Sequence, residues 1–265
     1  MRHAAGRPRA GHIGIFPKDA SSSEVIMVLS RLFFCGALVG VSVSCSPATD
    51  PETTMTVTSP AFAEGGIIPY EYTCQGRPFP VALGNPQIDW TSGPEGTQSY
   101  AIVVTHRAIA EALPPEDPNY FRGFMWAIWD IPATIKSVPA LISTVQRPPE
   151  VPGAQQWTSY NQFGWFSPCP NFDLEALAAD PASKVTDGYG ITVYALDTPT
   201  LALPQMPAGV TNFTMTLALH LNQIALAKYQ LNAVSDAVPT AGPTPPDMRP
   251  ALVYPDGIVA TPAPE

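Results

Sequence analysis

Few side chains in this chain have the types and spacing that chemistry needs. The sequence contains neither the G-x-S-x-G turn of serine hydrolases nor the G-x-x-x-x-G-K-[ST] loop that holds nucleotide phosphates. No two carboxylates stand at a spacing that argues for hydrolysis. Beyond residue 45 the chain has two histidines, far apart, and no C-x-x-C pair, which is too few ligands for a metal or an acid–base centre. We therefore predict a non-enzymatic protein with no catalytic residue, no metal and no cofactor.

The histidine with the most informative position is His106, because it follows an apolar run and has Arg107 beside it. Two interpretations stay open for this pair. It forms a local anion site, or it is a solvated pair at the start of a long polar insertion. His220 lies in an apolar, helix-like stretch, and we expect it to be a packed core residue.

Short apolar runs bounded by turn residues predict the elements that must hold these side chains. Three of them, Tyr100–Val104, Phe124–Trp129 and Gly190–Leu196, have the length and composition of buried strands. Asp89–Trp90, with prolines on both sides, suggests a short edge strand. The 32 prolines in 265 residues are about 12% of the chain, against a usual ~5%, and argue against a mainly helical protein.

Two segments have helical patterns. The longer one runs from Thr211 to Leu231, with apolar side chains at helical spacing at Leu217, Leu221, Ile224 and Tyr229. The shorter one covers Leu174 to Ala179. Together these elements predict a mainly β fold: a β-sandwich with a few peripheral helices, including one near 213–230.

The N-terminal segment looks like an export signal. Met27, the expected true start, is followed by a single Arg31 and an apolar run over Leu32–Val43 that is too short to span a bilayer comfortably. Small residues then lead to Cys45, as at the processing site of bacterial lipoproteins. We predict lipidation at Cys45. Ordinary secretion and an uncleaved anchor stay open.

Composition divides the chain into four parts: a leader and signal peptide over 1–44, a tether over 45–54, a domain over 55–235 and a proline-rich tail over 236–265. Five of the 13 basic residues and two of the 22 acidic residues precede Cys45, so the processed chain keeps 8 and 20 and a formal charge of −12. Such acidity argues against nucleic acid as a partner, because phosphate backbones need a basic face.

Seven motifs occur in an order that resembles the phosphatidylethanolamine-binding protein family, in its bacterial Raf-kinase-inhibitor-like branch. They are S-P-A-F-A-E-G-G-I-I-P from 59, Y-T-C-Q-G from 72, N-P-Q-I-D-W from 85, P-E-G-T-Q-S from 94, W-A-I-W-D-I-P from 126, F-G-W-F-S-P-C-P from 163 and Y-G-I-T-V-Y-A-L-D from 189. The resemblance covers about residues 55–232. It implies a β-sandwich with a small anion-binding pocket at one end.

The pocket is where this chain departs from the family pattern. The family usually has D-P-D-A-P after its buried strand, whereas Val104 is followed by T-H-R-A-I. The family usually has a histidine before the tryptophan of the next strand, where this chain has Met125 before Trp126. It often has H-R-Y where this chain reads D-G-Y at 187–189.

These departures predict a degenerate pocket. A phosphate needs N–H donors or positive charge, and Asp187 adds negative charge instead. We expect a small ligand that is polar or apolar rather than a phosphate. The candidate ligand-binding residues are His106, Met125, Trp126, Phe166, Ser167, Asp187 and Tyr189. Plain core packing of the large apolar members, and a simple D-G turn at the start of a strand, stay open as alternatives.

The resemblance also places the loops that carry Cys74 and Cys169 near the same end of the sandwich. Since an exported chain meets an oxidising compartment, we predict a disulfide between them, with two buried free thiols as the alternative.

The resulting expectation is a binding protein in the bacterial cell envelope, anchored by lipid, with secreted or periplasmic forms as alternatives. Its partner is a small ligand or an envelope protein. In the alternative function the pocket is vestigial, and the insertion at 107–122 or the proline tail makes an interaction or protease-inhibitor surface.

Overall fold

The structure is a computed structural model of the chain and describes residues 55–77, 84–117, 119–158, 163–203 and 213–240. The chain divides into Met1–Ala48 and Thr49–Glu265, and all described residues belong to the second unit. The predicted signal segment and the lipidation site Cys45 lie outside the described residues.

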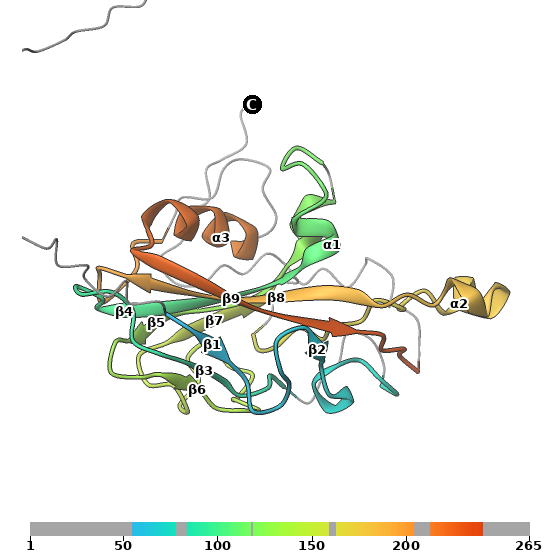
Figure 1. Ribbon diagram of the computed structural model, residues 1–265, viewed down its shortest axis with the longest axis horizontal. Coiled ribbons are helices and arrows are strands. Elements are labelled where there is room, and N and C mark those ends of the chain that lie inside the picture. Colours follow the sequence, from blue (N-terminus) through green and yellow to red (C-terminus); the bar gives the residue numbers. More distant parts are fainter. Residues whose placement is uncertain (1–54, 78–83, 118, 159–162, 204–212, 241–265) are drawn as a thin grey trace, which may run out of the picture. The chain divides into compact units, whose positions relative to one another are not determined.

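A six-stranded sheet forms the centre of the fold (Figure 1). Its neighbours are antiparallel except for the parallel pair at one edge. In spatial order the strands are β2 (Gly66–Ile67), β9 (Ala227–Ser235), β8 (Asp187–Leu196), β4 (Ser99–His106), β5 (Phe124–Pro132) and β7 (Gln155–Thr158). The three predicted buried strands are confirmed and are the neighbours β8, β4 and β5. They are apolar on both faces because both faces of this sheet are covered.

A smaller sheet lies over one face of the six-stranded sheet. It consists of β1 (Val57–Thr58), β3 (Ile88–Trp90) and β6 (Ser137–Val138), with β3 in the middle. The prediction of an edge strand at Asp89–Trp90 is therefore wrong. The prolines lie outside β3, so the main-chain groups on both of its edges are available for hydrogen bonds. Asp89 pairs with Thr58 on one edge and with Ser137 on the other.

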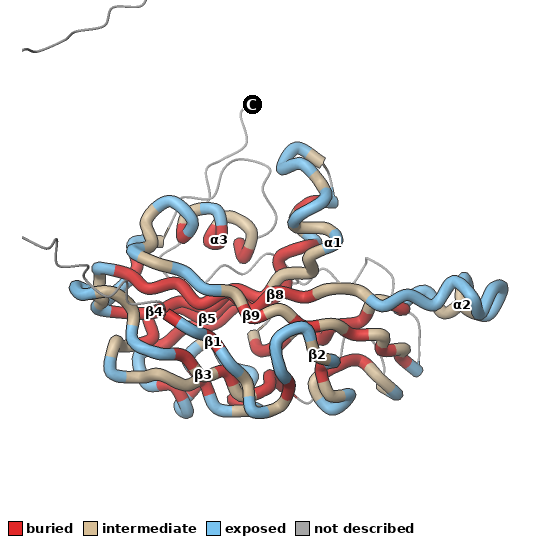
Figure 2. The backbone as a smooth tube through the Cα atoms, viewed as in Figure 1, coloured by how far each residue is buried: buried red, intermediate tan, exposed pale blue. Residues whose placement is uncertain are grey.

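Two large apolar cores fill the layers, and Figure 2 shows that the central strands are buried. The first lies between the two sheets and includes Trp90, Ile102 and Ile128. The second lies between the six-stranded sheet and α3 (Phe213–Ile224), and includes Trp129 and Phe213, whose rings are 5.3 Å apart. The expected sandwich with peripheral helices is confirmed.

The predicted helix near 213–230 ends earlier than its pattern suggested. Helix α3 ends at Ile224, and residues from Ala227 onward form β9 along the edge of β8. The apolar residues of that strand, Tyr229, Leu231 and Ala233, are two positions apart and so lie on one side of it. The apolar pattern therefore has the two-residue period of a strand in place of the helical one. His220, predicted as a core residue, is half-buried beside the buried stripe of α3 and is not part of the core cluster.

The remaining helical elements are short. Helix α2 (Leu174–Ala179) has the predicted bounds, and the Asp173 carboxylate accepts a hydrogen bond from the Ala176 N–H at 2.9 Å as its cap. Helix α1 (Arg107–Ala110) follows β4 directly, on the same face of the sheet as α3 (Figure 1). The single-turn 3₁₀ elements are η1 (Tyr70–Tyr72), η2 (Tyr120–Gly123) and η3 (Pro181–Ser183).

Candidate functional site

Three of the predicted residues meet where β4 ends and β8 begins; we call them the His106 site (His106, Asp187 and Tyr189). His106 is the last residue of β4 and lies opposite Tyr189 in the β4–β8 register, so both side chains are on the same face. His106 Nε2 is 2.9 Å from Asp187 Oδ2, and the imidazole stacks on the Tyr189 ring with centroids 5.0 Å apart. Strand pairing therefore joins side chains that are 81 residues apart in sequence.

The members of the His106 site differ in exposure. The His106 and Asp187 side chains are 16% and 25% exposed, whereas Tyr189 is 2% exposed beneath them. Burial, and then the charge of Asp187, raises the pKa of the Tyr189 phenol, and a main-chain hydrogen bond from Cys169 opposes the shift. The phenol is therefore neutral at ordinary pH, and its ring forms the buried floor of the site.

Arg107 does not contribute positive charge to this site. Its guanidinium donates two hydrogen bonds to the Glu111 carboxylate, at 2.7 and 2.9 Å, one helical turn away. The guanidinium of Arg107 lowers the pKa of that carboxyl. The imidazole of His106 is bonded to Asp187 and the guanidinium of Arg107 is bonded to Glu111, so both groups already have a carboxylate partner. The arrangement does not support the local anion site considered for this pair.

The other four predicted pocket residues are buried or half-buried. Met125, Trp126 and Ser167 are 3%, 0% and 0% exposed. Trp126 Nε1 donates to Gln156 Oε1 at 3.0 Å, and its ring contacts Trp165 edge-on. Phe166 is half-buried against the core between the sheets.

Gln156 and Trp165 were not predicted as site residues. Trp165 lies inside the F-G-W-F motif, which was the available signal.

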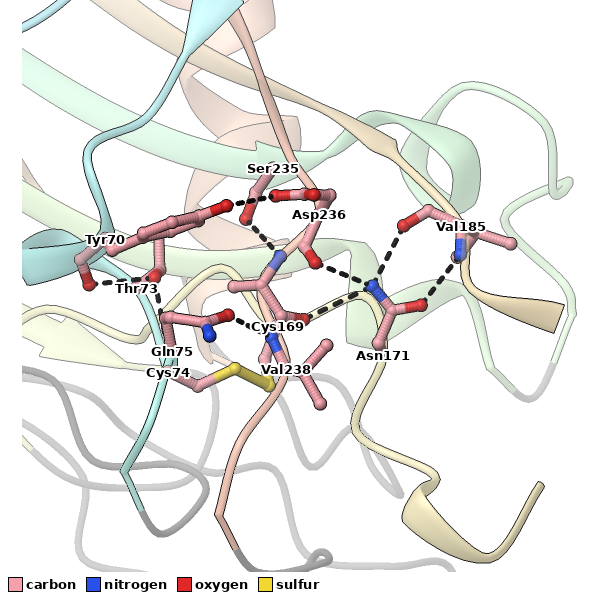
Figure 3. The surroundings of a disulfide bond; sticks show 11 residues. Tyr70, Thr73, Cys74, Gln75, Cys169, Asn171, Val185, Ser235, Asp236 and Val238 are labelled. Atoms are coloured by element: carbon pink, nitrogen blue, oxygen red, sulfur yellow. Dashed lines mark hydrogen bonds between the residues drawn. A yellow bond between two sulfur atoms is a disulfide. The ribbon is translucent and has the colours of Figure 1, made fainter. Parts of the chain in front are cut away.

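A disulfide joins Cys74 to Cys169 as predicted, with Cα atoms 5.4 Å apart (Figure 3). Cys74 N–H also donates to the Pro168 carbonyl at 3.3 Å. The bond thus fixes the loop whose Cys169 main chain is hydrogen-bonded to Tyr189. The disulfide is therefore linked to the His106 site through Tyr189.

The chain after β9 continues along this disulfide, past the predicted domain boundary at 235. Val238 N–H donates to Gln75 Oε1 at 2.8 Å, and the Thr240 N–H donates to the Arg77 carbonyl at 2.9 Å. Asn171 Nδ2 donates to the Asp236 carbonyl at 3.0 Å (Figure 3). Residues 236–240 therefore lie against the domain.

A separate groove of about 380 Å³ lies on the opposite face of the six-stranded sheet, and none of the seven predicted residues lines it. Within the described ranges there is no group of three or more His, Cys, Asp or Glu residues placed to hold a metal ion. Over those same residues, every helix is too short or too polar to cross a membrane.

Comparison with known proteins identifies relatives of the whole domain. The family model described as phosphatidylethanolamine-binding protein matches residues 58–233. A UPF0098 protein of Aquifex aeolicus is 29% identical over 153 residues, 57% of this chain and 72% of that protein. The Mycobacterium tuberculosis protein named "Putative lipoprotein LppC" is 29% identical over 174 residues, 66% of this chain and 68% of that protein.

Among solved structures, Escherichia coli YbcL, described as a new member of the mammalian PEBP family, is similar with a TM-score of 0.47 at 20% identity. The match covers 69% of this chain and 98% of that one. Because the family model spans residues 58–233, well over half of the sequence, the chain belongs to the phosphatidylethanolamine-binding protein family.

Proposed function

We propose that this chain is an exported, lipid-anchored, non-enzymatic binding protein that holds a small ligand at the His106 site. The observation that carries the proposal is the imidazole–carboxylate pair of His106 and Asp187, 2.9 Å apart and partly exposed above a buried tyrosine. The similarity to a protein named as a lipoprotein, together with the sequence before Cys45, supports the anchor.

The pair favours a ligand that brings hydrogen-bond donors. When the neutral imidazole donates from Nε2 to Asp187, its Nδ1 becomes an acceptor, and no residue within the described ranges is bonded to Nδ1. The Asp187 carboxylate adds further acceptor sites. A hydroxyl, an amide or an ammonium group therefore fits this site.

A phosphate fits poorly. At about 4 Å from Asp187, each unit of negative charge is repelled by about 4 kcal/mol at the dielectric usual near a protein surface. One charge-assisted hydrogen bond returns about 1.5–3 kcal/mol. The repulsion outweighs a single contact, and the side chains of His106 and Arg107 are already bonded to carboxylates.

The family resemblance sharpens this view. The usual motifs place acids after the strand that is β4 here and often a histidine at the start of the strand that is β8 here. This chain has the histidine at the end of β4 and the acid at the start of β8. The two group types are both retained, with their strands exchanged.

An NMR titration tests the ligand class, with ethanolamine and inorganic phosphate as probes. We expect ethanolamine to shift the amide signals of His106, Asp187 and Tyr189, and phosphate to leave them unchanged at 10 mM. Asp187→Asn should abolish the ethanolamine response, and Asp187→His should add a phosphate response. Asp197→Asn, just beyond the other end of β8, is the matched control and should behave as wild type. Phosphate binding to the wild type as tight as that of ethanolamine would overturn the proposal.

Native mass spectrometry of the protein from its own envelope fraction tests the anchor. We expect a chain that begins at Cys45 and carries acyl groups. An unmodified chain that begins at Met1 would contradict export.

The burial of the site favours a second candidate, an interaction module with a vestigial pocket. Met125, Trp126 and Tyr189 are each at most 3% exposed, so a ligand reaches them only if side chains move. The segment with α1 and η2 projects from the sheet (Figure 1) and offers a surface for an envelope protein. If neither probe shifts the His106 site and deletion of 112–117 removes a co-purifying envelope protein, this candidate replaces the first.

A further inference from the structure

The groove on the opposite face of the six-stranded sheet has a regular construction. In the β8–β9 register Thr192 lies opposite Gln230, and Tyr194 lies opposite Lys228, so these four side chains form one floor. Helix α3 forms one wall, and α1 with η2 forms the other; Figure 1 shows both on the same face of the sheet. The volume of about 380 Å³ is within the range of small-molecule sites.

The middle of the groove is aromatic and neutral. Tyr120 and Phe124 meet edge-on, with centroids 5.1 Å apart, and Tyr194 lies on the floor. Burial raises the pKa of Tyr194 to about 12, so this phenol carries no charge at ordinary pH. Ala218 and Leu219 of α3 add aliphatic surface. This lining favours an apolar body.

The charge in the groove lies at one end. Glu111 also lines the groove, but its carboxylate is neutralised by Arg107. Lys228 is the one cation among the described lining residues, and its Nζ donates a hydrogen bond of 2.6 Å to the neutral Asn222 Oδ1. No carboxylate of the described chain forms an ion pair with Lys228. The groove therefore has one positive charge without a counter-charge.

We propose that this groove binds a small monocarboxylate with an apolar body. The carboxylate pairs with Lys228 beside Asn222, and the body lies against Tyr120, Phe124 and Tyr194. A charge-assisted hydrogen bond to the ammonium supplies orientation, and burial of the apolar body supplies most of the affinity. The proposal is independent of the ligand at the His106 site, because the two sites use opposite faces of β4 and β8.

An NMR titration of the full domain with two probes tests the proposal. Decanoate represents an aliphatic body and 2-naphthoate an aromatic one. We expect at least one to give saturable shifts in the amides of residues 218–222 and 228–230, with a dissociation constant below 1 mM. Lys228→Gln should weaken binding at least 5-fold, and Lys228→Arg should retain it. Lys184→Gln is the matched control, because Lys184 is also an exposed lysine with one side-chain partner but lies outside the groove.

Each outcome decides between alternatives. Saturation by decanoate or by 2-naphthoate alone identifies the body that the groove prefers. Absence of saturation for both probes up to 5 mM, equal affinity in Lys228→Gln, or shifts centred on His106 and Asp187 would overturn the proposal. The last result would leave the His106 site as the binding site, so the two proposals fail separately. An unchanged amide spectrum away from residue 228 verifies that each variant is folded.

Discussion

Removing the disulfide between Cys74 and Cys169 should destabilise the domain strongly. The bond closes a loop with a sequence separation of 95 residues. In the chain-entropy relation a loop of this size restricts the unfolded chain by about 4.7 kcal/mol at 25 °C. Native domains are stable by about 5–15 kcal/mol, so this one bond accounts for a large fraction of the free energy of unfolding.

Urea denaturation followed by tryptophan fluorescence measures the effect, because the five tryptophans are all buried in the native state. With a slope of about 2 kcal/mol per M, Cys74→Ala/Cys169→Ala should lower the midpoint by about 2 M. Reductant should lower the wild-type midpoint similarly and leave the double variant unchanged, which controls for effects of the reductant itself.

A midpoint shift below about 0.5 M, with the oxidised bond verified by mass, would refute this reasoning. It would mean that the unfolded chain is already compact between the two cysteines, so that the link removes little freedom.

Two further predictions concern buried polar groups. Burial raises the pKa of Asp130, although its carboxylate accepts hydrogen bonds from the Leu201 N–H and Gln155 Nε2. The folded state therefore holds this proton more tightly than the unfolded state, and wild type should lose stability relative to Asp130→Asn as pH rises above 3.8, measured by urea unfolding at several pH values. Gln156→Ala should cost about 3 kcal/mol in the same assay, because it leaves Trp126 Nε1 and two main-chain carbonyls without their bonds; a loss under 1 kcal/mol would contradict this.

The elements predicted well were those with continuous, self-contained patterns. The three buried strands are apolar on both faces, which a short run of sequence records directly. The end of α3 was not predictable in the same way. The apolar residues of the helix, Leu217, Leu221 and Ile224, have a helical spacing, and Tyr229 fits that spacing by chance. Tyr229 is in a strand because its segment pairs with β8.

The membership of the candidate site stays a prediction, and the structure adds contacts that the sequence could not show. The family resemblance named His106 and Asp187, but their hydrogen bond depends on the β4–β8 register, which links residues 81 positions apart. The pairing of Arg107 with Glu111 is local, at helical spacing, and was available from the sequence. The groove could not be predicted from the sequence, because its walls come from α1 and α3, which are separated by more than a hundred residues.

The disulfide also changes what a cut in the main chain does. It makes a covalent ring of residues 74 to 169, which contains β3 through β7, while β1, β2, β8 and β9 lie on the two arms outside the ring. A protease that cleaves one peptide bond inside the ring converts a closed chain into a branched one and releases no fragment. A cut in either arm leaves two pieces that no covalent bond joins. The segment that carries β3 to β7 is thus the part of the chain that remains in a single covalent molecule after one cut.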